Sequence, residues 1–172
     1  MNNKYINTCS SLITDNSCFN LLSPEELAMV EGNQVMLNYN KGEIICKQGS
    51  HASHILLLQE GLVKAYLEGT PKDLILTIMP SGQLIGLPSI FEGNSTFLYS
   101  VSAYVDSCVK MINIDIIKTL ISQNSGFASR IINILNEGTA QNYGRFFSLI
   151  QKQLHGRMAD ILLCLSQRIF KS

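Results

Sequence analysis

Short apolar runs separated by single glycines fill the segment from Gln34 to Ile114, and no other feature of the chain restricts its fold as strongly. The glycines are Gly42, Gly49, Gly61, Gly69, Gly82, Gly86 and Gly93. Apolar, β-branched runs that end at glycines are typical of β-strands joined by tight turns. They predict strands at Val35–Tyr39, Glu43–Lys47, His54–Gln59, Leu62–Leu67, Leu74–Met79, Leu84–Ile85, Leu98–Val105 and Cys108–Ile114. Eight short strands indicate a compact all-β barrel or sandwich of the jelly-roll type over residues 34–114.

A short helix is expected before this domain, within a helical segment at residues 1–33. Ser23 can cap a helix, Pro24 suits its first position, and Glu26 completes a capping box. Leu27 and Val30 then supply its apolar side.

After Asn113 the apolar spacing becomes helical, which predicts a short helix and then a long one from about Ser125 to Leu154. The apolar face of the long helix is broader than a helix lying on one barrel needs, so a second copy of the helix is the expected partner. Packing only on its own barrel is the alternative. Residues 115–154 are therefore expected to form a homodimer. Its interface is predicted at Ile131, Ile134, Leu135, Gly138, Phe146 and Leu149.

Residues 155–172 predict a third helix that begins near a break at His155 and Gly156. Its apolar residues Ile161, Leu162 and Leu165 meet no later element in the sequence. We therefore expect that the chain is cut short inside a second domain. Because glycine tolerates large backbone changes, His155 and Gly156 are the expected hinge.

Composition excludes several classes of protein. The 172 residues are 46% hydrophobic and 15% charged, which excludes general disorder. Thirteen basic residues balance thirteen acidic ones, so this stretch carries no electrostatic footprint for nucleic acid. No apolar run is long enough for a signal peptide or a membrane span, which predicts a cytoplasmic protein without a membrane partner. The five scattered cysteines form no CxxC pair, so most are expected to be buried thiols rather than zinc or disulfide sites.

Several stretches resemble one family of transcription regulators. KGEIICKQG (41–49), ASHILLL (52–58), EGLVK (60–64) and PSGQLIG (80–86) resemble the opening hairpins of the cyclic nucleotide-binding domain of Crp/Fnr regulators. The resemblance continues through Val101-Ser102-Ala103, the long helix and the helix after Gly156. It implies a jelly-roll sensor domain, a dimerisation helix and the first helix of a winged helix-turn-helix. Because the recognition helix would lie beyond Ser172, only the full-length protein is expected to bind DNA.

The resemblance also implies where a cyclic nucleotide would bind. The family's phosphate-binding cassette has a glycine and a glutamate, and later an arginine and a small hydroxyl residue. This sequence keeps Gly86 but has Leu87 at the glutamate position, followed by Pro88, and has Phe97 and Leu98 at the arginine and hydroxyl positions. A buried phosphate without its arginine costs several kcal/mol, so no tight binding of cyclic AMP or cyclic GMP is expected.

Two interpretations of this pocket stay open. Phe97, Leu98 and Tyr99 either fill it or line a cavity for a smaller, more apolar effector of unknown identity. Asn142 and Tyr143 lie where family members reach toward the effector, although Asn142 can also set the dimer register and Tyr143 can pack as an ordinary aromatic. No cofactor is predicted.

Two other classes of protein compete with a regulator. One is a stand-alone dimeric jelly roll that binds a small molecule or a protein. The other is a cupin-like metal enzyme, but His51 and His54 lack the cupin ligand spacing and His155 falls at the end of the long helix. We therefore predict neither a catalytic residue nor a metal site.

Overall fold

The computed structural model describes residues 15–91 and 93–168. These residues form two compact units, which divide within the long helix between Ile131 and Ile132. The predicted N-terminal segment is thus described from Asp15 onward, and the predicted last segment up to Arg168. Residues 1–14 and 169–172 lie outside the described range.

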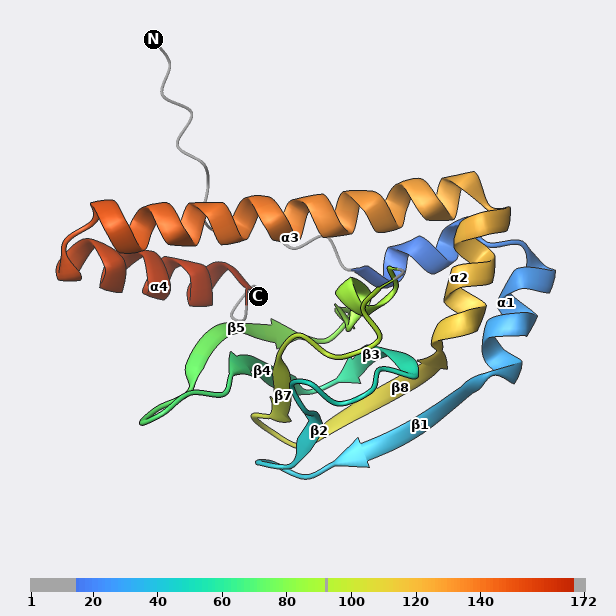
Figure 1. The fold of residues 1–172 in the computed structure, drawn as a ribbon, viewed down its shortest axis with the longest axis horizontal. Helices are drawn as coiled ribbons and strands as arrows, with labels where there is room; N and C mark the ends of the chain where they lie inside the picture. Colours follow the sequence, from blue (N-terminus) through green and yellow to red (C-terminus); the bar gives the residue numbers. More distant parts are fainter. Residues whose placement is uncertain (1–14, 92, 169–172) are drawn as a thin grey trace, which may run out of the picture. The chain divides into compact units, whose positions relative to one another are not determined.

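The first unit contains two antiparallel sheets of four strands each, which confirms the predicted jelly-roll class (Figure 1). One sheet has the order β1-β8-β3-β6 and the other has the order β2-β7-β4-β5. The strands are β1 (Gln34–Tyr39), β2 (Ile44–Cys46), β3 (His54–Glu60), β4 (Leu62–Leu67), β5 (Leu74–Pro80), β6 (Leu84–Ile85), β7 (Ser100–Ala103) and β8 (Ser107–Asn113).

Six of the eight predicted strands differ from the structure in their boundaries: β1, β3 and β5 each gain one residue, β2 loses one residue at each end, and β7 and β8 change as follows. Leu98–Val105 is shortened to β7, because the backbone N–H groups of Tyr104 and Val105 both donate to Leu62 O and turn the chain out of the ladder. Cys108–Ile114 shifts to Ser107–Asn113. The strand ends there because the Asn113 side chain accepts a hydrogen bond from the Asp115 N–H and caps α2 (Ile114–Gln123).

The hydrophobic core lies between the inner faces of the two sheets. Strand β4 shows the alternation that builds it, since Val63 and Ala65 point into the core and Lys64 does not. The buried cluster consists of Ile45, Cys46, Ala52, Leu56, Leu58, Val63, Ala65, Met79, Ile85, Phe97, Val101, Ala103 and Val109. Phe97 is thus a core residue, although it lies outside every strand.

The N-terminal helices are a 3-10 helix, η1 (Asp15–Leu21), and α1 (Pro24–Gly32). The predicted capping box is present. Glu26 N–H donates to Ser23 Oγ at 3.2 Å, and Ser23 N–H donates to Glu26 Oε2 at 2.8 Å. Asn124, which caps the end of α2, also donates to Glu26 Oε2 at 2.9 Å, so the box ties α1 to α2.

The second unit contains most of α3 (Ser125–Gln151) and all of α4 (Leu154–Arg168). Helix α3 is continuous through Gly138 and Gly144, in agreement with the prediction of one long helix in this part of the chain. Helix α4 folds back along the last turns of α3 (Figure 1), where Lys152 and Asp160 form an ion pair. No helix in the described part of the chain is long and apolar enough to cross a membrane.

The described cysteines differ in their chemistry. Cys18 and Cys46 are buried thiols, and Cys108 is a half-buried thiol. Cys164 is disulfide-bonded, and it is thus an exception to the expectation that most of the cysteines are buried thiols.

Candidate functional site

The predicted site begins where β6 ends, at Gly86. This residue has φ +89°, a left-handed conformation that strains any residue with a Cβ atom. Gly86 turns the chain directly into a short 3-10 helix, η2 (Leu87–Ser89), with Pro88 in its first turn. Leu87, the residue directly after this turn, has a buried apolar side chain.

Phe97 lies against this turn. Its Cε1 atom is 2.8 Å from the position that a Cβ atom would occupy on Gly86, and its side chain is 7% exposed. The backbone holds the ring in place, since Phe97 N–H donates to Ser50 O at 3.0 Å and Phe97 O accepts from Gly49 N–H at 2.8 Å. The loop after β2 therefore fixes Phe97 over Gly86.

Tyr99 approaches the same turn from the strand side. Its hydroxyl accepts a hydrogen bond from Gly86 N–H at 3.4 Å, and its ring packs against the core cluster. The side chain between them in sequence, Leu98, is 50% exposed. Of the predicted pocket residues, the structure thus brings Gly86, Phe97 and Tyr99 together and leaves Leu98 at the surface.

The other predicted residues lie on α3 and at its end. Asn142 and Tyr143 belong to the second unit and are exposed. Of the predicted dimer residues, Ile131 and Ile134 are buried within the single chain, while Leu135, Gly138 and Phe146 are exposed; the side chain of Leu149 lies outside what the structure describes. His155 and Gly156 are in the first turn of α4.

The segment that corresponds to the family's phosphate-binding cassette, Leu84 to Tyr99, is called the cassette of this chain, and it has no cationic side chain. From Leu84 to Tyr99 the sequence contains no lysine and no arginine. The Gly86 N–H, a group that could donate to a phosphate oxygen, already donates to Tyr99. The turn therefore offers neither a guanidinium nor that amide to an anion.

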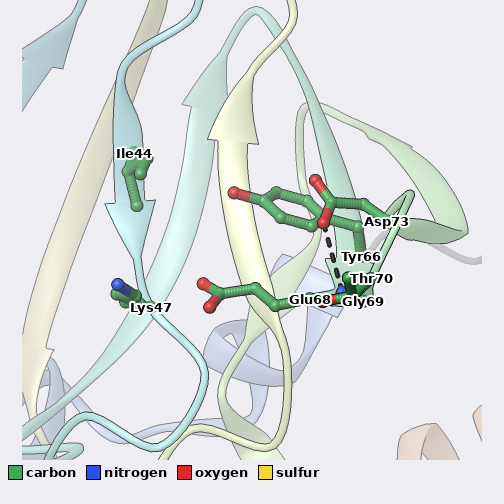
Figure 2. Close-up of a pocket in the computed structure, with 7 residues that line it drawn as sticks. All are labelled: Ile44, Lys47, Tyr66, Glu68, Gly69, Thr70 and Asp73. Atoms are coloured by element: carbon green, nitrogen blue, oxygen red, sulfur yellow. Dashed lines mark hydrogen bonds between the residues drawn. The ribbon is translucent and has the colours of Figure 1, made fainter.

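A hollow lies near the C-terminal end of β4 (Figure 2). Its lining residues are Ile44, Lys47, Tyr66, Glu68, Gly69, Thr70 and Asp73. The Glu68 side chain extends to the side on which Lys47 lies in Figure 2, and Asp73 accepts a hydrogen bond from Gly69 N–H at 3.3 Å. Glu68 also accepts from Ser100 Oγ at 2.8 Å. The sequence reasoning missed this group, because its members come from β2, β4 and the β4–β5 turn without any common motif.

Another hollow lies between the cassette loop and the start of α2. Its polar lining includes His51, Ser53, Asn94, Asp115 and Lys118. Ser53 Oγ is within 2.8 Å of His54 Nδ1, so His54 is engaged by its sequence neighbour. Among the described residues, no three histidine, cysteine or acidic side chains are grouped so that they could hold a metal ion.

A jelly roll with a glycine turn after β6, followed by α2 and the long helix α3, is the fold of cyclic nucleotide-binding-like domains. The sequence matches the cyclic nucleotide-binding domain family over residues 36–124, just over half of the chain. The chain belongs to that family.

Solved structures agree with this assignment. The sensor domain of the transcriptional regulator DNR from Pseudomonas aeruginosa is 21% identical, with a TM-score of 0.63 over 69% of this chain and 84% of that one. A protein from Eubacterium rectale assigned to the Crp/Fnr family is 18% identical, with a TM-score of 0.75 over 86% and 69%. The catabolite activator protein of Thermus thermophilus is 20% identical, with a TM-score of 0.64 over 77% and 62%.

These likenesses confirm the predicted resemblance to Crp/Fnr regulators in its fold. No curated protein matches the sequence significantly.

Proposed function

We propose that this chain is the sensor and dimerisation region of a Crp/Fnr-like transcription regulator whose cassette does not take a cyclic nucleotide. The observation that carries the proposal is the ring of Phe97 over Gly86, in the place where the family resemblance expects an arginine. The Phe97 side chain occupies the space beside the turn, and the Tyr99 hydroxyl accepts the hydrogen bond of the Gly86 N–H. The pocket is therefore filled by the chain itself.

Electrostatics supports the same conclusion. A cyclic nucleotide brings one phosphodiester charge, and burial of that charge without a cationic partner costs several kcal/mol. Each 1.4 kcal/mol weakens binding about tenfold. A phosphate would also have to displace Phe97 from the core cluster, which adds the cost of losing that packing.

Calorimetric titration of the purified chain with cyclic AMP and cyclic GMP tests this proposal. We expect no binding at micromolar nucleotide, and native mass spectrometry should show no additional mass on the protein. The double variant Leu87→Glu/Phe97→Arg restores the glutamate and the arginine of the family cassette and should gain detectable affinity, whereas Leu98→Arg, at the exposed neighbouring position, should not. Micromolar binding by the unmodified chain would refute the filled cassette.

The dimer is the second part of the proposal. Ile132, Leu135, Tyr143, Phe146 and Ile150 are all exposed and recur along one stripe of α3. A stripe this apolar is costly in water and suits a parallel copy of the same helix. The stripe retains Leu135 and Phe146 from the predicted interface, while the buried Ile131 and Ile134 pack within their own chain.

Sedimentation velocity distinguishes this dimer from a monomer. Phe146→Lys places a charge in the stripe and should shift the protein to a monomer, while Asn133→Lys, on another exposed face of α3, should leave the dimer intact. A monomeric parent chain, or a dimer that tolerates Phe146→Lys, would contradict the interface.

DNA is proposed as the partner of the complete regulator. The support is the family fold and the names of the similar proteins, which are transcriptional regulators. In this proposal residues 34–114 are the effector domain, residues 115–154 the dimerisation helices, and residues 155–172 the start of the DNA-binding domain. His155 and Gly156 are the hinge between the last two parts.

A further inference from the structure

On the last turns of α3 and on α4, polar side chains are buried and large apolar side chains are exposed, which is the reverse of the usual arrangement. Ser148 of α3 is 7% exposed, whereas Ile150, two residues further on, is 77% exposed. Helix α4 repeats the pattern, since Asp160 is half-buried and Ile161 and Leu162 are exposed. Among the side chains that the structure describes, polar groups are thus buried between the two helices, and several large apolar side chains face away from the contact.

Three polar side chains make the contact. Lys152 Nζ donates to Asp160 Oδ1 at 2.8 Å and to Asp160 Oδ2 at 2.6 Å. Ser148 Oγ also donates to Asp160 Oδ2. Lys152 is the first residue after the end of α3, and its backbone N–H donates to Ser148 O at 3.1 Å. Ser148 and Lys152 therefore lie one turn apart, and both reach the same carboxylate on α4.

Gly156, in the first turn of α4, lies beside the Lys152 side chain. A Cβ atom built on Gly156 would lie 3.4 Å from Lys152 Cβ, so the start of α4 passes close to the lysine stem. The hydrogen bonds from Lys152 and then from Ser148 hold the pKa of Asp160 below its ordinary value. Asp160 therefore stays ionised at neutral pH, and the ion pair persists.

We propose that Ser148, Lys152 and Asp160 form a latch that holds α4 against α3 and releases it when the ion pair is broken. An ion pair with side chains 37% and 22% exposed is open to water, and a polar contact is easier to separate than a packed apolar core. The latch thus gives the helix pair a closed and an open arrangement. Because the latch involves only α3, α4 and the turn between them, this inference does not depend on the proposed dimer or on the filled cassette.

Hydrogen–deuterium exchange of the whole chain tests the latch. A reductant is present in every sample, so that the disulfide at Cys164 does not restrain α4. Lys152→Asp and Asp160→Lys should each raise the exchange rate of amides in residues 154–168 about five- to tenfold. The double variant Lys152→Asp/Asp160→Lys reverses the pair and should restore rates to within about twofold of the parent.

Two further variants sharpen the comparison. Asp160→Asn keeps the shape of the side chain but removes its charge, and it should also raise exchange in α4. Lys118→Asp changes an exposed lysine of α2 and should leave exchange in α4 unchanged. Single variants that exchange at the parent rate would overturn the latch, as would a double variant that exchanges as fast as either single one.

Discussion

Cε1 of Phe97 lies 2.8 Å from the place where a Cβ atom of residue 86 would be, which makes Gly86 and Phe97 a complementary pair. The glycine leaves room for the ring, and the ring lies directly against the turn. Ile55 Cδ1 lies 3.7 Å from the same position and forms another wall of this small space. Substitutions at either residue should therefore reveal the contact.

Gly86→Ala should destabilise the domain more than Gly42→Ala. Both glycines have φ near +90°, so both alanines incur the same backbone strain, but only position 86 has Phe97 within contact. We expect a total loss of about 2–4 kcal/mol at position 86 and about 1–2 kcal/mol at position 42. Urea unfolding of the two variants measures the difference in unfolding free energy. Equal losses would show that the Phe97 ring moves aside without a loss of stability.

Phe97→Ala should cost about 3–4 kcal/mol of unfolding free energy, because it leaves a cavity in the core cluster. The matched variant is Leu98→Ala, whose side chain is 50% exposed, and it should cost under about 1 kcal/mol. Chemical denaturation followed by circular dichroism gives both values. A Leu98→Ala loss as large as that of Phe97→Ala would mean that the two side chains are not divided between core and surface.

Acid should weaken the contact between α1 and α2 through Glu26. Hydrogen bonds from the Ser23 backbone and from Asn124 lower the pKa of Glu26 in the folded protein. A lowered pKa means that the charged carboxylate stabilises the fold above its unfolded pKa, and that this contribution is lost as the pH falls through the folded pKa.

Glu26→Gln should therefore flatten the decline of stability with acid between about pH 5 and pH 3. Glu25→Gln, in the same turn of α1, is the control for a change of charge. Urea midpoints measured across this range test the expectation. If Glu26→Gln and the parent declined in parallel, Glu26 would not be the group responsible.

Thiol reactivity should differ sharply between two strands. Burial raises the pKa of Cys46 to about 12, so about one molecule in ten thousand carries its thiolate at pH 8. Cys108 on β8 is half-buried and more accessible. Alkylation followed by peptide mapping should label Cys108 at least about a hundredfold faster than Cys46 in the folded protein. Equal labelling rates would show that β2 opens readily.

Local features of this protein could be predicted from the sequence. Ser23, Pro24 and Glu26 predict the start of α1 because a helix cap forms among residues three apart. Leu62–Leu67 and Leu84–Ile85 were predicted with the boundaries that the structure has, since the glycines that delimit these runs act on their immediate neighbours. The eight strands and the jelly-roll class follow from the number and length of such runs.

The groups that meet across the fold could not be predicted in this way. Phe97 and Leu98 are both apolar in sequence, and only the hydrogen bonds of Phe97 to Gly49 and Ser50 decide which of them enters the core. Likewise, no sequence pattern joins Ser148 and Lys152 to Asp160, because their contact depends on the turn that brings α4 back along α3. Helix caps and turns depend on residues close in sequence, whereas the cassette and the latch depend on which distant side chains the backbone brings within reach.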